Sequence, residues 1–419
     1  MITVLKNSWA LLLGMLLLML GNGLHGTLLG VRGAIENFDS NWMGFIMSGY
    51  FIGFLGGSKL TPVLLRRVGH VRVFAALGSL VSAAFILYAT LVDTWVWMFL
   101  RVVVGFCFSG IYVVAESWMN ESADNETRGQ ALSTYLIVQM AGIVLGQLLL
   151  NVADPSGYGL FVLITVLVSI SFAPILLSSS PAPMFQTARP MSLGELIKAS
   201  PLACWGTFIL GGIFSVLFAM SPVYATESGL SVKQVSYFVT AIFAGGMVCQ
   251  YPIGWLSDRM DRRKLIVILT GLGAAIALAG FAKTNAANGY VIAFLLGGVS
   301  NPLYSLLIAY ANDYLDADQM PAASGGLLFI NGVGAMSGPV TVGFVMNSFG
   351  TQYFFVFIAV LMLAICIYGV YRSFKRDAVS VEEAAPYIPI TSRSTYVATE
   401  IAIEVVEEET EEEDDEKER

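Results

Sequence analysis

The stretch GWLSDRMDRRK, residues 254 to 264, places six charged side chains between two long apolar segments. The 23 residues from 235 to 257 on one side, and the 18 residues from 265 to 282 on the other, contain no Asp, Glu, Lys, Arg or His. A membrane core about 30 Å thick needs roughly 20 apolar residues per helix. Each segment is therefore predicted to cross a membrane, and the charged stretch is the loop between them.

The composition of the whole chain fits a protein whose solvent is lipid. Apolar residues make up 56% of it, charged residues 12%, and the mean hydropathy is +0.73. The apolar runs are continuous and do not alternate as barrel strands do, so they predict an all-α polytopic membrane protein with twelve transmembrane helices. The expected spans are residues 8–30, 42–61, 73–92, 95–117, 129–152, 158–177, 202–226, 234–256, 265–283, 288–312, 322–346 and 351–371.

Lys and Arg are unevenly divided between alternate loops. Thirteen fall on one side of the predicted membrane, and only Arg32, Lys233 and Lys283 fall on the other. Because cytoplasmic loops carry the excess of basic residues, both termini are expected in the cytoplasm, with the chain in the plasma (inner) membrane. The apolar run after Lys6 has no small-residue cleavage site, so the first helix is expected to stay uncleaved.

The sequence gives no sign of a cofactor or of catalysis. All four cysteines lie in predicted spans without CxxC spacing, and there are only two histidines, so neither a disulfide nor a metal site is expected. The GxSxG, HExxH and P-loop motifs are missing from the sequence. We therefore expect no enzyme, no cofactor and no nucleic-acid partner.

The chain repeats itself at an offset of 192 residues. This shift places PVLLRRVGH, from Pro62, on GWLSDRMDR, from Gly254, and it also places Gly142 and Gly146 on Gly334 and Gly338. A repeat of this length predicts two pseudo-symmetric six-helix bundles.

We accordingly divide the chain into four parts. Residues 1–177 form the first bundle, and residues 178–201 form a cytoplasmic linker in which Ser192 and Glu195 have the spacing of a capping box that opens a short amphipathic helix. Residues 202–372 form the second bundle. Residues 373–419 hold fifteen acidic and five basic residues and are expected to be a disordered acidic cytoplasmic tail. A contact between this tail and the basic loop at residues 259–264 is a further possibility.

These features resemble the major facilitator superfamily of secondary transporters over residues 1 to 372. GWLSDRMDRRK is similar to the loop signature of that family between helices 8 and 9, and RVVVG, residues 101–105, is similar to its arginine motif in helix 4. The first copy of the loop signature is degraded, with Pro62 in place of glycine and Arg66 in place of aspartate. YVVAESWMN, RGQALSTYLIVQMAGIVLGQLLLN and YPIGWLSDR resemble the YcaD-like branch of the family.

The resemblance implies a central cavity lined by helices 1, 4, 7 and 10. The polar side chains on those helices are mostly neutral and often aromatic, which favours a small amphipathic or uncharged solute, or an organic anion held by Arg101. Two alternatives remain: Arg101 snorkels to the interface, and the neutral groups only bond neighbouring helices. The substrate-binding candidates are Asn22, His25, Arg101, Ser109, Tyr112, Tyr224, Asn301 and Tyr304, with Ser215 also in this set.

Proton coupling and gating have their own candidates. Intramembrane ionisable groups are functional candidates by default, so Glu116, His25 and Arg101 are the proton-coupling candidates; the alternatives are an interfacial cap for Glu116 and a structural role for His25. Asp258 is expected to latch onto the amino terminus of helix 5 when the cytoplasmic side is shut. The gating candidates are Asp258, Arg259, Arg262, Arg66, Arg67 and Arg128, and acidic residues near Asp313 are expected to oppose the arginines of the first copy.

The sequence therefore predicts a transporter that moves a small organic solute across the inner membrane by alternating access, coupled to protons. The alternatives are a facilitated-diffusion uniporter and a receptor or scaffold that transports nothing. The expected partners are a small-molecule substrate, the lipid bilayer and protons, and we expect a monomer.

Overall fold

The computed structural model describes residues 2–122, 125–177, 192–282, 286–315, 319–375, 387 and 398, without the side chains of residues 2–7, 120–122, 125–128, 286, 287 and 321. The regular elements in this part of the chain are helices. The first half holds α1 (Ile2–Ile35), α2 (Ser40–Val68), α3 (His70–Thr90), α4 (Thr94–Ser122), α5 (Asn125–Leu148), η1 (Leu149–Asn151), α6 (Gly159–Ser171) and α7 (Ala173–Leu177). The second half holds α9 (Pro201–Ser215), η2 (Val216–Met220), α10 (Ser221–Glu227), α11 (Val232–Ser257), α12 (Arg262–Phe281), α13 (Ala286–Asn312), α14 (Met320–Phe349) and α15 (Tyr353–Ser373).

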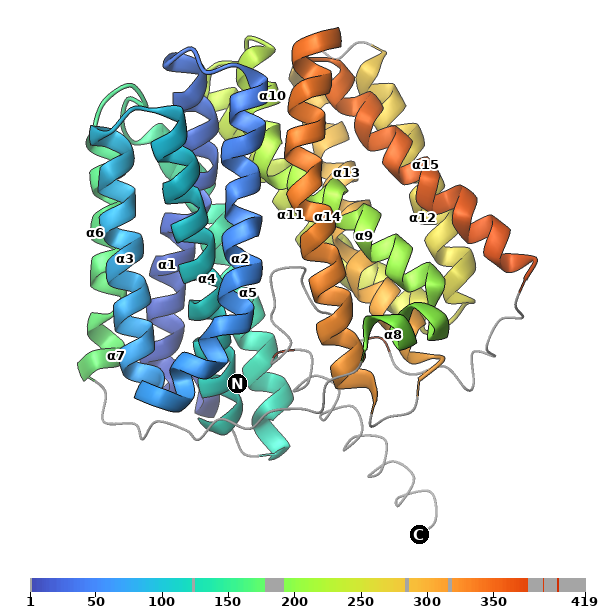
Figure 1. The fold of residues 1–419 in the computed structure, drawn as a ribbon, viewed down its shortest axis with the longest axis horizontal. Helices are drawn as coiled ribbons and strands as arrows, with labels where there is room; N and C mark the ends of the chain where they lie inside the picture. The colour runs from blue at the N-terminus through green and yellow to red at the C-terminus, as the bar shows by residue number, and fades with distance from the viewer. Residues whose placement is uncertain are drawn as a thin grey trace.

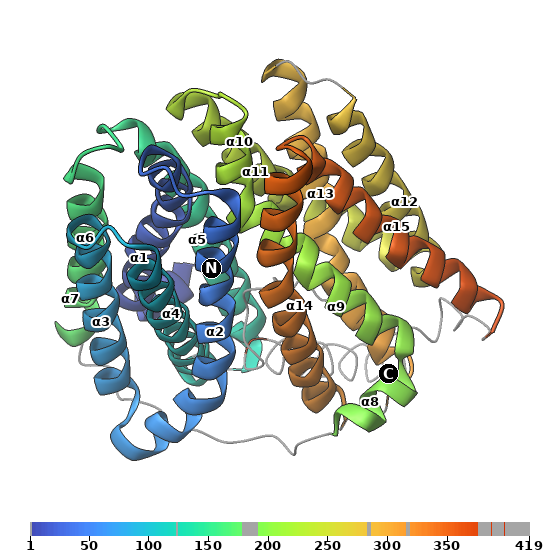
Figure 2. The ribbon, with the colours of Figure 1, turned by 45° about the horizontal axis from the view of Figure 1, so that its top comes forward.

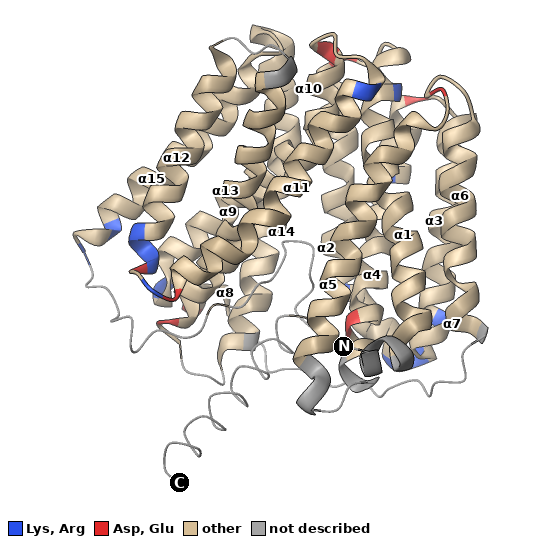
Figure 3. Cartoon of the chain, turned by 180° about the vertical axis from the view of Figure 1, so that it is seen from behind, with Lys and Arg blue, Asp and Glu red and all other residues tan. Residues whose placement is uncertain are grey.

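The two halves form two helical bundles that stand side by side (Figures 1 and 2). We name the two ends by their place in Figure 1: at the lower face α1 begins and α15 ends, and at the upper face α1 ends and α15 begins. The bundles meet toward the upper face and diverge toward the lower face. Charged residues gather at the two ends of the helices and leave a nearly uncharged band between them (Figure 3), as a protein that spans a bilayer requires.

Eleven helices in the described part of the chain are long and apolar enough to cross a membrane. The predicted polytopic all-α class is confirmed. α2 is not among the eleven, although it is 29 residues long and packs closely on α4, so the number of twelve spans stays a prediction.

The offset of 192 residues reappears as identical backbone contacts in the two halves. A Cβ atom added to Gly53 of α2 would lie 1.9 Å from the carbonyl oxygen of Val102 in α4, and one added to Gly245 of α11 would lie 1.9 Å from that of Phe294 in α13. The absence of a side chain lets the two backbones touch. Both residues of the contact shift by 192, so the bundles share helix packing as well as sequence.

The glycine pairs of the repeat lie at a second set of equivalent crossings. Gly142 and Gly146 of α5 face the backbone of α1 at Leu16 and Leu20. Gly334 and Gly338 of α14 face the backbone of α9 at the positions 192 residues further on, Phe208 and Gly212.

The linker and the charged stretch 254–264 owe their turns to helix caps. α8 (Leu193–Ala199) begins with the predicted capping box between Ser192 and Glu195. Asp261 accepts hydrogen bonds from the backbone N–H groups of Arg263 (2.9 Å) and Lys264 (3.4 Å), and so caps α12. Because the first N–H groups of a helix have no partner within it, one acidic residue suffices to end the loop and start the next helix.

Candidate functional site

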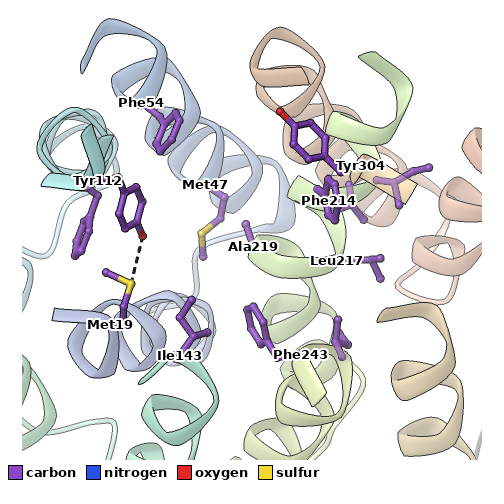
Figure 4. Packing of buried hydrophobic residues seen from close by; sticks show 14 of the residues in the cluster. Met19, Met47, Phe54, Tyr112, Ile143, Phe214, Leu217, Ala219, Phe243 and Tyr304 are labelled. Carbon is purple, nitrogen blue, oxygen red and sulfur yellow. Dashed lines mark hydrogen bonds between the residues drawn. The ribbon is translucent and has the colours of Figure 1, made fainter. Parts of the chain in front are cut away.

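A central cavity lies between the two bundles. Residues of α1, α2, α4 and α5 line it on one side, and residues of α9, η2, α11 and α14 line it on the other. Six of the lining residues are aromatic: Tyr50, Phe51, Phe54, Phe214, Phe218 and Phe243. Figure 4 shows Phe54 on α2 across from Phe214 and Phe243. Five more offer polar groups: Asn22, Thr27, Arg101, Gln147 and Asn331.

Arg101 is the charged group of this cavity, and α4 delivers it to an almost fully buried position. Its Nη1 atom lies 3.0 Å from Nδ1 of His25, and its guanidinium carbon lies 5.1 Å from the ring centre of Tyr50. An arginine that stacks on an aromatic face and bonds an imidazole is held in one orientation. Its Nη2 atom lies 3.6 Å from the sulfur of Met47, and the guanidinium forms part of the cavity wall.

His25 lies behind Arg101, outside the cavity lining. Its ring centre is 4.3 Å from that of Phe85 and 4.8 Å from that of Tyr88, and the side chain is fully buried. Because a guanidinium only donates, Nδ1 must accept and the ring proton lies on Nε2 in this arrangement. The histidine therefore positions the arginine.

Asn22 joins the cavity to the interior of the first bundle. Its side-chain amide donates to the Tyr112 hydroxyl (3.2 Å), which in turn lies 3.5 Å from the sulfur of Met19 (Figure 4). Tyr112 itself is fully buried. Deeper on α4, the fully buried Glu116 accepts a hydrogen bond from the Tyr135 hydroxyl (3.4 Å), to which Gln139 also donates (3.2 Å).

The wall opposite Arg101 is shaped by a π-helix. Residues Val216–Met220 form η2 between α9 and α10, and Phe218 and Ala219 of this segment line the cavity. Pro222 follows and has no N–H to give to the carbonyl four residues earlier, at Phe218. The helix relaxes into a wider turn at that point, as is frequent at functional sites, and presents the Phe218 ring to the cavity.

Gln147 lines the cavity and also bonds the second bundle toward the upper face. Its side chain lines the cavity, donates to the Gly23 carbonyl (2.9 Å) and accepts from Thr27. Its backbone carbonyl accepts from the Ser236 hydroxyl of the second bundle (2.7 Å), and Asn151 donates to that same hydroxyl (3.0 Å).

Further contacts close the upper face. Ser40 donates to Glu227 across the two halves (2.6 Å). A Cβ atom on Gly30 would lie 2.7 Å from Pro222, and one on Gly44 would lie 2.4 Å from the Pro339 carbonyl. These close approaches between the two bundles leave little room for a solute to pass, so the upper face is sealed.

The other predicted binding residues lie apart from the cavity lining. Ser109 is fully buried where α4 meets Gly57 of α2. Tyr224 stacks on Phe354 with ring centres 4.6 Å apart, toward the upper face. Tyr304 packs edge-on against Phe214, behind the cavity wall. Asn301 donates to Gln250 (3.4 Å) between α13 and α11.

The predicted gating residues form pairs within their own half. Arg262 is buried and pairs with Asp313, and it lies 3.5 Å from Asp258. Arg263 is buried too and donates to the Arg372 carbonyl (3.3 Å). These partners explain why the second copy of the loop is so strongly charged.

The remaining gating candidates are spread over both copies of the loop. Arg259 stacks on Trp255, with its guanidinium carbon 4.2 Å from the ring centre. Arg66 and Arg67 are exposed at the end of α2. The side chain of Arg128 lies outside the described part of the chain. The latch between Asp258 and helix 5 concerns a conformation shut at the lower face and stays a prediction.

Sequence reasoning missed much of the cavity because it took the lining from helices 1, 4, 7 and 10 alone. Tyr50, Phe51 and Phe54 of α2, Gln147 of α5 and Phe243 of α11 all contribute. The spacing of Tyr50, Phe51 and Phe54 places them on one face of the helix. An aromatic face on a helix of modest hydropathy could have indicated from the sequence that this helix lines the cavity.

The architecture is two bundles of membrane-spanning helices with a cavity between them. A model of the Major Facilitator Superfamily matches residues 11–247 and 203–394. The chain belongs to the Major Facilitator Superfamily: it is a multi-pass membrane transporter of small molecules, and it is not an enzyme.

Relatives and solved structures agree with this assignment. The MFS-type transporter YcaD of Escherichia fergusonii is 28% identical over 355 residues, which cover 83% of this chain and 91% of the relative. YcaD of Salmonella heidelberg is 28% identical over 368 residues, 86% of this chain and 94% of the relative. A crystal structure of the nucleoside transporter NupG superposes with a TM-score of 0.73 at 14% identity, and the match covers 88% of this chain and 100% of the NupG chain. A mutant of NupG superposes with a TM-score of 0.77 at 12% identity, and the match covers 87% of this chain and 99% of the mutant chain. The similarity to YcaD confirms the predicted branch, and the similarity to NupG confirms the fold.

Proposed function

We propose that this transporter moves a small, ring-containing organic solute, neutral or anionic, across the inner membrane by alternating access. The observation that carries the proposal is the lining of the central cavity, where six aromatic rings surround Arg101 and the three carboxamides of Asn22, Gln147 and Asn331.

Each component of the lining selects a feature of the solute. Aromatic side chains favour offset or edge-on contact with a planar ring. Carboxamides both donate and accept hydrogen bonds, which suits a polar solute without a net charge. Arg101 adds the option of a carboxylate or another anion, which a guanidinium binds through two parallel hydrogen bonds. Among the residues that line the cavity there is no carboxylate to neutralise an organic cation.

The two-fold construction supports alternating access. The same glycine crossings hold each bundle together, so each can move as one body while the contacts between bundles change. With the lower face in the cytoplasm, as the basic loops favour, the contacts at the upper face close the outward side, and the bundles diverge on the inward side (Figure 1).

Glu116 is the proposed proton site. It is a fully buried carboxyl group inside a membrane bundle, a costly placement that marks functional residues. The Tyr135 hydroxyl bonds it, and Tyr112, one helical turn before it on α4, bonds Asn22 of the cavity. A change in the protonation of Glu116 can thus reach the cavity through side chains of a single helix.

The test begins with a thermal-shift screen of the purified protein against nucleosides, aromatic carboxylates, uncharged aromatic amides and organic cations. Hits are then followed by flux into proteoliposomes with and without a pH gradient. We expect hits among the neutral and anionic rings, flux that is lost in Arg101→Ala for anions, and gradient-driven flux that is lost in Glu116→Gln. Binding of cations alone would overturn the solute class. Gradient-independent flux would instead favour a uniporter, and hits without flux a receptor.

A further inference from the structure

One residue of the acidic tail is docked into the second bundle. The backbone N–H of Tyr387 donates to Oδ1 of Asp258 (3.0 Å), the residue that ends α11. Its side chain reaches back along α11, where Nε2 of Gln250 donates to the phenol oxygen (2.9 Å). Tyr387 is therefore held at both ends, by a charge-assisted bond at the backbone and by a carboxamide at the ring.

The surface under the ring is built to accept it. A Cβ atom added to Gly254 would lie 2.6 Å from Cε1 and 2.8 Å from Cδ1 of Tyr387, and the three nearest atoms all belong to that ring. Gly254 thus leaves a flat piece of helix backbone on which the ring lies. A side chain at this position would displace the tyrosine.

The polar floor of this pocket connects α11 with α13. Nε2 of Gln250 also donates to the Ser305 hydroxyl (3.1 Å), and Asn301 donates to Oε1 of Gln250 (3.4 Å). Gln250 is therefore oriented by two residues of α13 so that its amide N–H points at the phenol. Burial raises the pKa of the Tyr387 phenol, which keeps it a neutral partner for that amide.

The Tyr387 contact lies on α11 between the central cavity and the lower face. Phe243 lines the cavity, and Gln250 and Gly254 follow it at seven and eleven residues, close to whole numbers of helical turns, on the same face of α11. At 1.5 Å per residue, Gly254 is roughly 16 Å from Phe243 along the axis. Ala398, further along the tail, is also buried, at 1% exposure.

We propose that the groove of Gln250, Gly254 and Asp258 on α11 and Ser305 on α13 is a binding site for a tyrosyl side chain, and that Tyr387 of the tail occupies it as a tethered plug. The consequence rests on the proposed alternating access. While Tyr387 is seated, it covers the face of α11 that must approach the first bundle when the lower face shuts, and it engages the carboxylate of Asp258. The tail thereby stabilises the conformation that is open at the lower face and slows its closing.

The binding of Tyr387 in this groove can be tested without any substrate. The photoreactive residue p-benzoylphenylalanine is placed at position 387 of the full chain, and after irradiation the cross-linked peptide is identified by mass spectrometry. We expect cross-links to the α11 segment around Gly254. The control carries the same residue at Tyr371, an exposed tyrosine of α15, and should give no cross-link to α11. Cross-links from position 387 spread over unrelated segments would overturn the site.

The effect on conformation is tested with spin labels at Gln130 on α5 and Arg259 after α11, both exposed. Short distances between the labels report the conformation that is closed at the lower face, and Tyr387→Ala should raise their share. Tyr387→Phe should raise the ratio of closed to open molecules by roughly fivefold, the usual effect of one lost hydrogen bond. Unchanged distance distributions in Tyr387→Ala would overturn the plug. Because neither measurement needs a permeant, both remain decisive if the proposed solute class is wrong.

Discussion

Arg101 and His25 are joined by a hydrogen bond of 3.0 Å between Nη1 and Nδ1, with the imidazole enclosed by Phe85 and Tyr88. The two residues come from α4 and α1, so the bond fixes the guanidinium relative to two helices. The cavity thus holds its cation in a fixed position, with the imidazole packed behind the guanidinium.

Removing the acceptor behind Arg101 should weaken solute binding. His25→Phe keeps a ring between Phe85 and Tyr88 but loses the bond to the guanidinium. Hydrogen bonds to charged groups contribute about 1.5–3 kcal/mol, so the KM for an anionic solute should rise by at least about tenfold, with little change in kcat. Concentration-dependent uptake measures this.

The matched control for that substitution is His70→Phe. His70 is the other histidine of the chain, also buried, and bonds Ser117 (3.0 Å) away from the cavity. The substitution His70→Phe should leave the KM for the anionic solute unchanged. Equal effects of the two substitutions would show that His25 acts only through stability.

The repeated glycine crossings predict matched losses of stability. Gly53→Ala and Gly245→Ala would each drive a Cβ atom to within 1.9 Å of a carbonyl oxygen, and overpacking of this kind costs about 1–3 kcal/mol or more. We expect similar drops in the midpoint of thermal unfolding in detergent. Gly194→Ala, with no atom within 4 Å of the new Cβ, should be neutral or slightly stabilising. A large difference between the two crossings would argue against equivalent packing.

Two aspartates near Arg262 should differ strongly in their effect on stability. Asp313 pairs with Arg262 where both side chains are nearly inaccessible, at 5% and 3%, whereas Asp258 is 43% exposed. Removing one partner of a buried pair costs about 3–5 kcal/mol, and an exposed pair contributes about 0–1 kcal/mol. Asp313→Asn should therefore lower the unfolding midpoint far more than Asp258→Asn does. The reverse order would contradict the pairing.

The contact between Asn151 and Ser236 offers a covalent test of the sealed upper face. The two side chains meet at 3.0 Å across the bundles, close enough for cysteines at these positions to approach disulfide geometry. In a background without Cys107, Cys204, Cys249 and Cys366, the Asn151→Cys/Ser236→Cys pair should cross-link under oxidation and stop transport. Reductant should restore it, because the upper face must open in each cycle. Transport at the normal rate in the cross-linked protein would refute that requirement.

The membrane-spanning class, the approximate position of the helices and the register of the duplication could all be predicted from the amino-acid sequence. Apolar length, loop charge and the 192-residue offset are properties of residues close together in the chain or compared at a fixed shift. Capping signals such as Ser192 and Glu195 are local as well. Such features need no knowledge of how helices rotate about their axes.

The contacts between distant residues became known from the three-dimensional arrangement of the helices. It placed His25 behind Arg101 and outside the cavity lining, paired Arg262 with Asp313 in its own half, and brought α2, α5, α11 and α14 into the cavity wall. It also seated Tyr387 on α11, more than a hundred residues away in the chain. Contacts of this kind depend on the rotation and tilt of each helix. Close backbone crossings and buried polar pairs together set this rotation and tilt, and the sequence of a uniformly apolar helix does not encode them.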